Sequence, residues 1–335
     1  MRMTPVNPLI DRMEQLVVCP VCKKKLTKTN QRVYVCSGCE RGYPFEDGIL
    51  TLVSPDLPHD KLMEAEWHDK AADSYAEKHQ FNTPKVAHYV SDTLSPILAL
   101  PQKSLILEIG CGTGEAGTRL LERHYVVEAD ISRGMLLKAL RQQSNPNAMY
   151  VLADAEDIPF ESGSFDAVYV DATLHHLPNP LAGVKEITRV VKRGGLIVVA
   201  SEPNRWPLKV VRPWARLLRR RSSVMDAKTN GFGYEEMRGL LSSPELSIVK
   251  LGPMWYISGF VFGLQGVLGR KFLPSFIDRF FVFVDEMIGK TPLLRRYGWH
   301  WTAIALKGNG PQSGQSEQDP ESARRSPLGN PTNQT

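Results

Sequence analysis

Leu105-Ile-Leu-Glu-Ile-Gly110-Cys-Gly-Thr-Gly-Glu115 is the stretch that decides how this 335-residue chain folds. Its apolar first half predicts a buried strand, and the glycines that follow predict a tight turn in front of a helix. The spacing Gly110-x-Gly112-x-Gly114 differs from the GxGxxG pattern of most dinucleotide sites. Glu108, just before the turn, would repel a pyrophosphate but suits the cationic end of a ligand. The stretch therefore predicts a ligand site at the carboxyl end of this strand.

Apolar runs and amphipathic segments alternate on both sides of this stretch. The apolar runs predict strands at residues 104–109, 125–129, 148–152, 165–170 and 196–200. The periodic segments between them predict helices at residues 115–123, 134–143 and 181–191. This order predicts an α/β fold with a doubly wound, mostly parallel sheet that helices cover on both faces.

Acidic residues follow two further strands of the expected sheet. Asp130 ends the second strand, where its carboxylate can accept hydrogen bonds from both hydroxyls of a ribose. Asp154 leaves the third strand, placed to accept from an adenine amino group, with Ala155 offering a backbone contact and Ile131 an apolar one. The three strand ends together therefore predict a site for a nucleoside with a cationic substituent.

Five ordered motifs carry a family resemblance: LEIGCGTGE, VEADIS, LADAEDIPFESGSFDAVYV, LHHLPNP and GGLIVVASEP. The chain resembles the class I S-adenosylmethionine (SAM)-dependent methyltransferases, in particular the small-molecule branch that includes quinone-biosynthesis enzymes. The resemblance implies SAM as cofactor and a seven-stranded Rossmann-like sheet with an antiparallel edge strand, its last two strands at 246–251 and 301–307. The glycine spacing and the DAEDIPF element argue against an NAD-binding fold. The cofactor residues expected are Glu108, Gly110, Gly112, Gly114, Asp130, Ile131, Asp154 and Ala155.

Asp171, His175 and His176 follow the fourth strand, at the edge where open α/β sheets bind ligands. Methyl transfer needs a general base only when the acceptor group must lose a proton. His175 is the first candidate for that base, with His176 and Asp171 after it. The alternative is structural, because in the resembling family the HHL element caps the next segment and lines the cofactor pocket.

Two CxxC pairs stand near the N-terminus, Cys19-x2-Cys22 and Cys36-x2-Cys39, separated by thirteen residues. Four thiolates at this spacing complete a tetrahedral zinc site and leave no position open for catalysis, so we expect a structural zinc ion. Four free cysteines are the alternative. The segments VVCPVCKKKL, YVCSGC and YPFEDGILTLV resemble the zinc ribbons that accompany some methyltransferases, including ribosomal RNA guanine methyltransferases.

The chain divides into a zinc ribbon at 14–54, a helical connector at 55–95, a methyltransferase domain at 96–307 and a disordered tail at 308–335. Two insertions, 204–233 and 252–300, exceed a minimal domain and combine large apolar residues with arginines. They predict an apolar acceptor or peripheral contact with an anionic membrane. The alternative is a helical lid packed on its own core.

A net charge of +5 is too small for a dedicated nucleic-acid binder. No signal peptide and no apolar run of about 20 residues is visible, which predicts a cytoplasmic protein without a transmembrane segment, peripheral at most at the inner membrane surface. The expected function is methyl transfer from SAM to a small-molecule or lipid- or glycan-linked acceptor. Two alternatives are an RNA base methyltransferase that docks RNA through the ribbon, which the DAEDIPF and HHLPNP motifs disfavour, and an inactive SAM-binding partner subunit.

Overall fold

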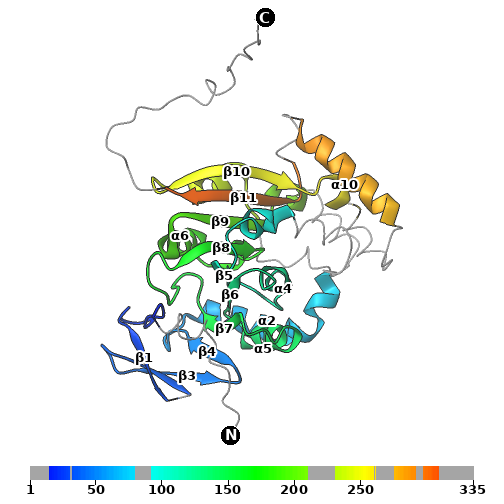
Figure 1. Ribbon diagram of the computed structural model, residues 1–335. Coiled ribbons are helices and arrows are strands. Elements are labelled where there is room, and N and C mark those ends of the chain that lie inside the picture. The colour runs from blue at the N-terminus through cyan, green and yellow to red at the C-terminus, as the bar shows by residue number, and fades with distance from the viewer. Residues whose placement is uncertain are drawn as a thin grey trace, which may run out of the picture.

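The computed structural model describes residues 15–30, 32–79, 92–209, 231–259, 261, 275–291 and 297–308 (Figure 1). Its strands form a single mixed sheet, in the order β1-β2-β3-β4-β7-β6-β5-β8-β9-β11-β10. Helices pack against both faces of the central part of this sheet. The predicted α/β architecture with a parallel Rossmann-like core is confirmed, but among the described residues the sheet has eleven strands rather than the expected seven, because the N-terminal strands join it.

The parallel centre of the sheet is formed by β5 (Leu105–Ile109), β6 (Tyr125–Asp130), β7 (Ala148–Ala153), β8 (Phe165–Asp171) and β9 (Val191–Pro203). All five residues of β5 are buried, as expected for the middle strand of a sheet covered on both faces. The glycine turn therefore starts at the centre of the sheet. The carboxyl ends of β5, β6, β7 and β8 all meet at that same edge.

The last two strands of the chain complete one side of the sheet. β11 (His300–Lys307) runs antiparallel to both β9 and β10 (Leu246–Met254). Trp301, at the start of β11, is fully buried, and its indole N–H donates to the carbonyl of Phe232 at 2.8 Å. The two expected strands are confirmed and are longer than predicted, but the antiparallel strand β11 lies between β9 and β10 rather than at the edge of the sheet.

The other side of the sheet is formed by the N-terminal strands, which are β1 (Leu26–Asn30), β2 (Val33–Cys36), β3 (Gly42–Glu46) and β4 (Ile49–Leu52). The first three pairings are antiparallel, whereas β4 runs parallel to β7 and pairs with residues 150–153. The cysteine-bearing segment is therefore continuous with the catalytic sheet, and β4 covers the edge that β7 would otherwise expose (Figure 1).

Helix boundaries follow local capping. α5 (Arg133–Gln142) begins after Ser132, whose side chain accepts from the N–H of Met135, and α6 (Pro180–Val190) begins after Asn179 with proline in its first turn. The helix expected at 115–123 is only four residues long, α4 (Gly117–Leu120). Gly117 lies so close to Glu128 that a Cβ would collide with that carboxylate, and the chain forms turns on either side. The helix expected at 181–191 ends at Val190, and the glycines at 194–195 lie within β9.

The structure also contains α2 (His59–His79), the 3-10 helix η1 (Leu174–His176), α8 (Tyr234–Leu241) and α10 (Ser275–Gly289). α2 falls in the expected helical connector, whose residues 80–91 lie outside the described part of the chain. Residues 210–230 and 262–274 of the two insertions and 309–335 of the expected disordered tail also lie outside it. Within the described ranges, no helix combines the length and the apolar character that crossing a bilayer would require.

Candidate functional site

A cavity of about 760 Å³ opens at the carboxyl edge of the parallel strands. Four strand ends contribute to its lining, in the order β5, β6, β7 and β8, and each carries at least one residue that the sequence predicts. The predicted residues in the lining are Gly110, Gly112, Asp130, Ile131, Asp154, Ala155, Asp171 and His176. Residues that lie up to 66 positions apart therefore share one cavity, because parallel strands end at a common edge.

The glycine turn has the backbone geometry that its sequence predicts. Gly110, Gly112 and Gly114 have φ values of 69°, 54° and 82°, in the left-handed region that favours glycine. A Cβ on Gly110 would also collide with the side chain of Thr173. Asp130 holds the turn in place, since its Oδ2 accepts from the N–H of Gly112 at 2.9 Å. The turn and the acidic strand end therefore form one rigid floor of the cavity.

Glu108 and Gly114 differ from the expectation, because neither belongs to the described lining of the cavity. Side chains alternate along a strand, so Ile109 faces the cavity and Glu108 the opposite layer. There Glu108 lies beside Glu128, its partner in the register of β5 and β6. Burial raises the pKa of both carboxyls, that of Glu128 to about 8. Glu108 is therefore half of a buried acidic pair with raised pKa values, and it lies outside the described lining of the cavity.

α2 covers the cavity with residues that sequence analysis did not select. They are Lys61, Glu64, His68 and Tyr75. Their spacings of three, four and seven residues place them on one face of a helix. The spacing of these polar and aromatic residues in the expected connector was the one signal in the sequence that this helix contributes to the site. It was missed because nothing in the sequence links this helix to the distant glycine turn.

Two residues of α2, Lys61 and Asp69, fasten the helix over the cavity. Nζ of Lys61 lies 2.6 Å from Oδ2 of Asp154 and 2.8 Å from Oε2 of Glu156. Burial lowers the pKa of Lys61, but the two carboxylates outweigh it and raise the net pKa above its usual range. Further along α2, Oδ1 of Asp69 accepts from the N–H of Gly134 at 2.7 Å, at the N-terminus of α5. Asp154, the expected adenine contact, is thus already ion-paired to the helix above it.

The two histidines of the LHHL motif have different environments. Nδ1 of His175 lies 2.8 Å from Oε2 of the fully buried Glu202, and His175 is absent from the described lining. Nδ1 of His176 lies 2.7 Å from Oε1 of Glu64, and His176 lines the cavity. The same Oε1 lies 3.2 Å from Nε2 of His68. The hydrogen bonds from both imidazoles lower the pKa of Glu64.

Asp171 tests whether the cavity fits a cationic cofactor. Its Oδ1 is buried and has no hydrogen-bond partner among the described residues. Burial raises the pKa of this carboxyl. A nearby ammonium or sulfonium group would lower the pKa again, because a positive charge favours the carboxylate form. Ala172, the next residue, has a φ of 48° and lines the same cavity. With Asp130 and Asp154, the lining therefore offers three acidic side chains to a positively charged nucleoside, which is the chemistry of SAM.

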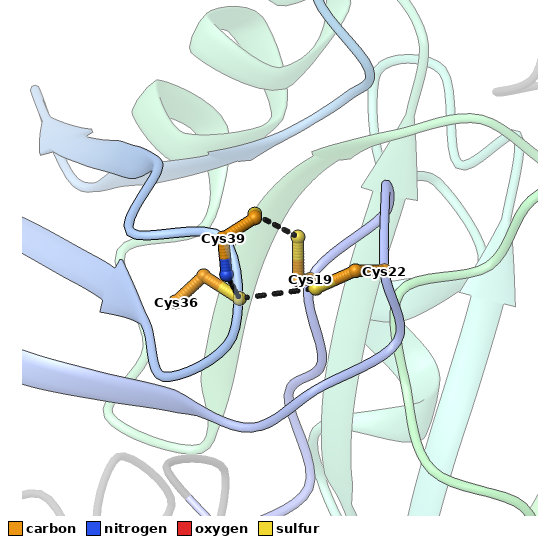
Figure 2. Close-up of side chains that lie close together, drawn as sticks. All are labelled: Cys19, Cys22, Cys36 and Cys39. Carbon is orange, nitrogen blue, oxygen red and sulfur yellow. Dashed lines mark hydrogen bonds between the residues drawn. The ribbon is translucent and has the colours of Figure 1, made fainter.

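The four N-terminal cysteines converge from two turns, as Figure 2 shows. Their sulfurs lie within 4.8 Å of one another, with 3.6 Å between Cys19 and Cys39 and 3.3 Å between Cys22 and Cys36. A tetrahedral zinc ion with Zn–S bonds of about 2.3 Å separates its sulfurs by about 3.8 Å. The N–H groups of Gly38 and Cys39 point at the sulfur of Cys36. The set therefore fits one tetrahedral metal ion.

The cysteine cluster also contacts the loop that carries Asp154. The N–H of Val18 donates to the carbonyl of Pro159 at 3.0 Å, and the N–H of Glu161 donates to the carbonyl of Leu16 at 2.9 Å. Lys23, in the first cysteine turn, forms an ion pair with Asp157. The segment that carries the cysteine cluster is therefore fixed to the loop that follows β7, on the way to the cavity.

Comparison with known proteins agrees with this geometry. Residues 107–199 match the methyltransferase domain family. A demethylmenaquinone methyltransferase of Clavibacter sepedonicus is 39% identical over 98 residues, which is 29% of this chain and 40% of that protein. A malonyl-acyl-carrier-protein O-methyltransferase of Marinomonas sp. is 34% identical over 156 residues, 45% of this chain and 56% of that protein. The chain thus spans about half the length of the curated relatives it matches, or less.

A solved structure shares the fold alone. Phosphoethanolamine N-methyltransferase 2 of Haemonchus contortus, in complex with S-adenosyl-L-methionine, is 15% identical with a TM-score of 0.51, and the match covers 76% of this chain and 60% of that one. Sheet order, glycine turn and acidic strand ends together define a class I SAM-dependent methyltransferase domain. Residues 107–199 match the model of the methyltransferase domain family, and quinone-biosynthesis methyltransferases are among the proteins to which the chain is similar.

Proposed function

We propose that this protein transfers the methyl group of SAM to a small-molecule acceptor or to an acceptor carried on a lipid or glycan. One observation carries the proposal, namely that four strand ends with Asp130, Asp154 and Asp171 line one cavity next to a left-handed glycine turn. In this assignment the glycine turn and Asp171 face the amino-acid end of SAM. Asp130 accepts from the ribose hydroxyls, and Asp154 and Ala155 border the adenine.

The chemical step in this assignment is an in-line displacement. A lone pair of the acceptor forms a bond to the methyl carbon, the bond from that carbon to sulfur breaks, and sulfur leaves as the neutral thioether. The protein's contribution is to hold acceptor and methyl about 3 Å apart and to exclude water. α2 serves both purposes, because it lies over the cavity and is fixed near its N-terminus by Lys61 and at its middle by Asp69.

His176 is the proposed base when the acceptor is a protonated hydroxyl. Two observations support His176 over His175: His176 lines the cavity, and its ring is oriented by Glu64. Burial and the neighbouring histidines lower its pKa, despite the carboxylate, so the ring is neutral and able to accept a proton near pH 7. His175 is proposed to hold the backbone after β8 through Glu202 instead.

For the cysteine cluster we propose a structural zinc ion bound by Cys19, Cys22, Cys36 and Cys39. The convergent sulfurs and their tetrahedral spacing support it. Such an ion contributes folding free energy in a segment too small to build a large core. It would stabilise β4 against β7 and, through Val18 and Lys23, the loop that carries Asp154.

RNA docking through the ribbon is the disfavoured alternative. Lys23 is paired with Asp157, and Nζ of Lys25 lies 3.7 Å from Glu161, so carboxylates of this chain would compete with RNA phosphates for two of the ribbon's lysines. The exposed apolar face of α10 favours a lipid-linked acceptor instead. Phe276, Phe280 and Phe283 are each more than half exposed on it.

The decisive experiment has two parts on the full chain. Calorimetric titration with SAM and with its demethylated product should give one site per chain. Labelled methyl-SAM incubated with cell extract should then transfer its label to the lipid or small-molecule fraction. No binding heat would overturn the cofactor assignment, whereas label in the RNA fraction would overturn the acceptor class and leave the cofactor assignment intact.

A further inference from the structure

Glu64, His68 and His176 form a second cluster of metal-ligating groups, separate from the cysteines. One carboxylate oxygen contacts both imidazoles. Oε1 of Glu64 lies 2.7 Å from Nδ1 of His176 and 3.2 Å from Nε2 of His68. All three ligand atoms lie within 4.8 Å of one another. A metal ion about 2.1 Å from each ligand separates them by about 3.0–3.4 Å, so only small movements would admit an ion at their centre.

The positions of the three residues match how proteins build such sites. Glu64 and His68 are four residues apart on α2, so they share one face of a helix. His176 belongs to η1, which follows β8, so the third ligand approaches the site from a different element than α2. Two imidazoles and one carboxylate on a rigid helix and a distant turn are a ligand set for divalent transition metals, leaving positions open for other ligands.

The open positions face the cofactor cavity, because all three residues line it. The same cavity is lined by Asp130, Asp154 and Asp171, whereas Lys61 is its only lysine or arginine in the described lining. Three carboxylates against one ammonium supply the negative charge that a divalent ion beside a sulfonium requires. The neighbouring His175 lies outside the described lining of the cavity, so it is not among the proposed ligands.

We propose that Glu64, His68 and His176 bind one divalent transition-metal ion in the cofactor cavity, and that the acceptor is bound to this ion through an oxygen atom. The ion's role rests on the proposed function, but its binding does not. With the ion bound, His176 acts as a ligand in place of the base, because a hydroxyl bound to the ion loses its proton to solvent more readily. The oxygen lone pair then forms the bond to the methyl carbon while the carbon–sulfur bond breaks. The acceptor class is therefore an alcohol, phenol or enol.

Manganese provides the test, because Mn²⁺ prefers nitrogen and oxygen ligands and leaves a thiolate site to zinc. The full chain is saturated with Mn²⁺, freed of unbound metal by gel filtration, and its total bound metal is counted by elemental analysis. The wild type should hold one equivalent more than His68→Ala and one more than Glu64→Gln. Free Mn²⁺, followed by its paramagnetic resonance, should show at least a tenfold loss of affinity in both variants.

Matched controls come from the same helix. His59→Ala and Glu66→Gln change exposed residues of α2 outside the cluster, and both should retain the extra equivalent. Equal metal content in wild type and both cluster variants would overturn the proposal. SAM titration of the same variants separates this failure from that of the proposed function. If the wild type binds SAM but holds no extra metal, only the metal-site proposal is rejected. If the wild type does not bind SAM, the methyltransferase assignment is rejected.

Discussion

Oε2 of Glu202 lies 2.8 Å from Nδ1 of His175, and the same carboxylate accepts from the backbone N–H groups of residues 173–175. Burial raises the pKa of Glu202, but His175 and these N–H groups outweigh it, so its net pKa lies below the usual range. This pair fixes the segment after β8, and it leaves His176, not His175, at the cavity. His176 therefore lines the cavity, where the sequence led us to expect His175.

The two histidines should respond differently to alanine. His175→Ala leaves a buried carboxylate without its imidazole, which costs about 2 kcal/mol and lowers Tm by about 5 °C. His176→Ala should leave Tm nearly unchanged and lower turnover at saturating SAM at least tenfold. Scanning fluorimetry and initial rates measure the two effects. Full turnover in a folded His176→Ala protein would contradict the assignment.

Asp130 should dominate the affinity for the nucleoside. Its Oδ1 and Oδ2 each accept one backbone N–H, from Ser132 and Gly112, and each has a further lone pair for a ribose hydroxyl. Asp130→Asn should weaken SAM and product binding by about 10- to 100-fold, or about 1.4–2.7 kcal/mol, in calorimetric titration. Asp92→Asn, at an exposed carboxylate away from the cavity, serves as control. Equal affinities for both variants would contradict the ribose contact.

Loss of the cysteine cluster should affect the catalytic sheet as well as the ribbon. Cys22→Ser with Cys39→Ser should remove about one equivalent of zinc and lower Tm, since β4 then no longer covers the edge of β7. SAM affinity should fall with it, because Val18 and Lys23 contact the loop after β7. Ser37→Ala, in an exposed residue of the same turn, is the control. Zinc loss with unchanged Tm would show that the ribbon stabilises only itself.

The buried carboxyl of Glu128 predicts a pH dependence of stability. Its folded-state pKa of about 8 exceeds the ordinary 4.5, so the folded protein holds a proton that the unfolded chain releases. Stability should therefore be complete below pH 4.5 with respect to this group and decline as pH rises through 8. Glu128→Gln should remove this decline, so its Tm should exceed that of wild type at pH 9 but not at pH 5. Glu122→Gln, on the surface, should follow wild type.

The apolar face of α10 should bind lipid. Phe276, Phe280, Phe283 and Met287 recur at helical spacing and are each more than half exposed. The full chain should sediment with vesicles containing anionic lipid at low salt. Phe276→Ser with Phe280→Ser should reduce the bound fraction severalfold and leave SAM affinity unchanged. If the sedimented fraction depends neither on anionic lipid nor on these substitutions, the predicted membrane contact is wrong.

Much of the cofactor edge could be predicted because its signals are local. The three glycines indicate a backbone conformation that only glycine adopts readily. Asp130 and Asp154 follow apolar runs, and this position indicates the ends of strands. Glu108 shows the limit of such reasoning. Its position next to the turn suggested the cavity, but the alternation of side chains along β5 turns it toward Glu128 on the opposite face.

The sequence by itself determined the class of fold, the glycine turn and the convergence of the cysteines, because short-range spacing and strand period specify these. Only the tertiary structure decided that α2 covers the cavity with Lys61, Glu64 and His68, that β4 joins β7, and that His176 rather than His175 faces the ligand. These relations join segments about 90 to 110 residues apart, and their contacts arise from packing, which no local pattern encodes.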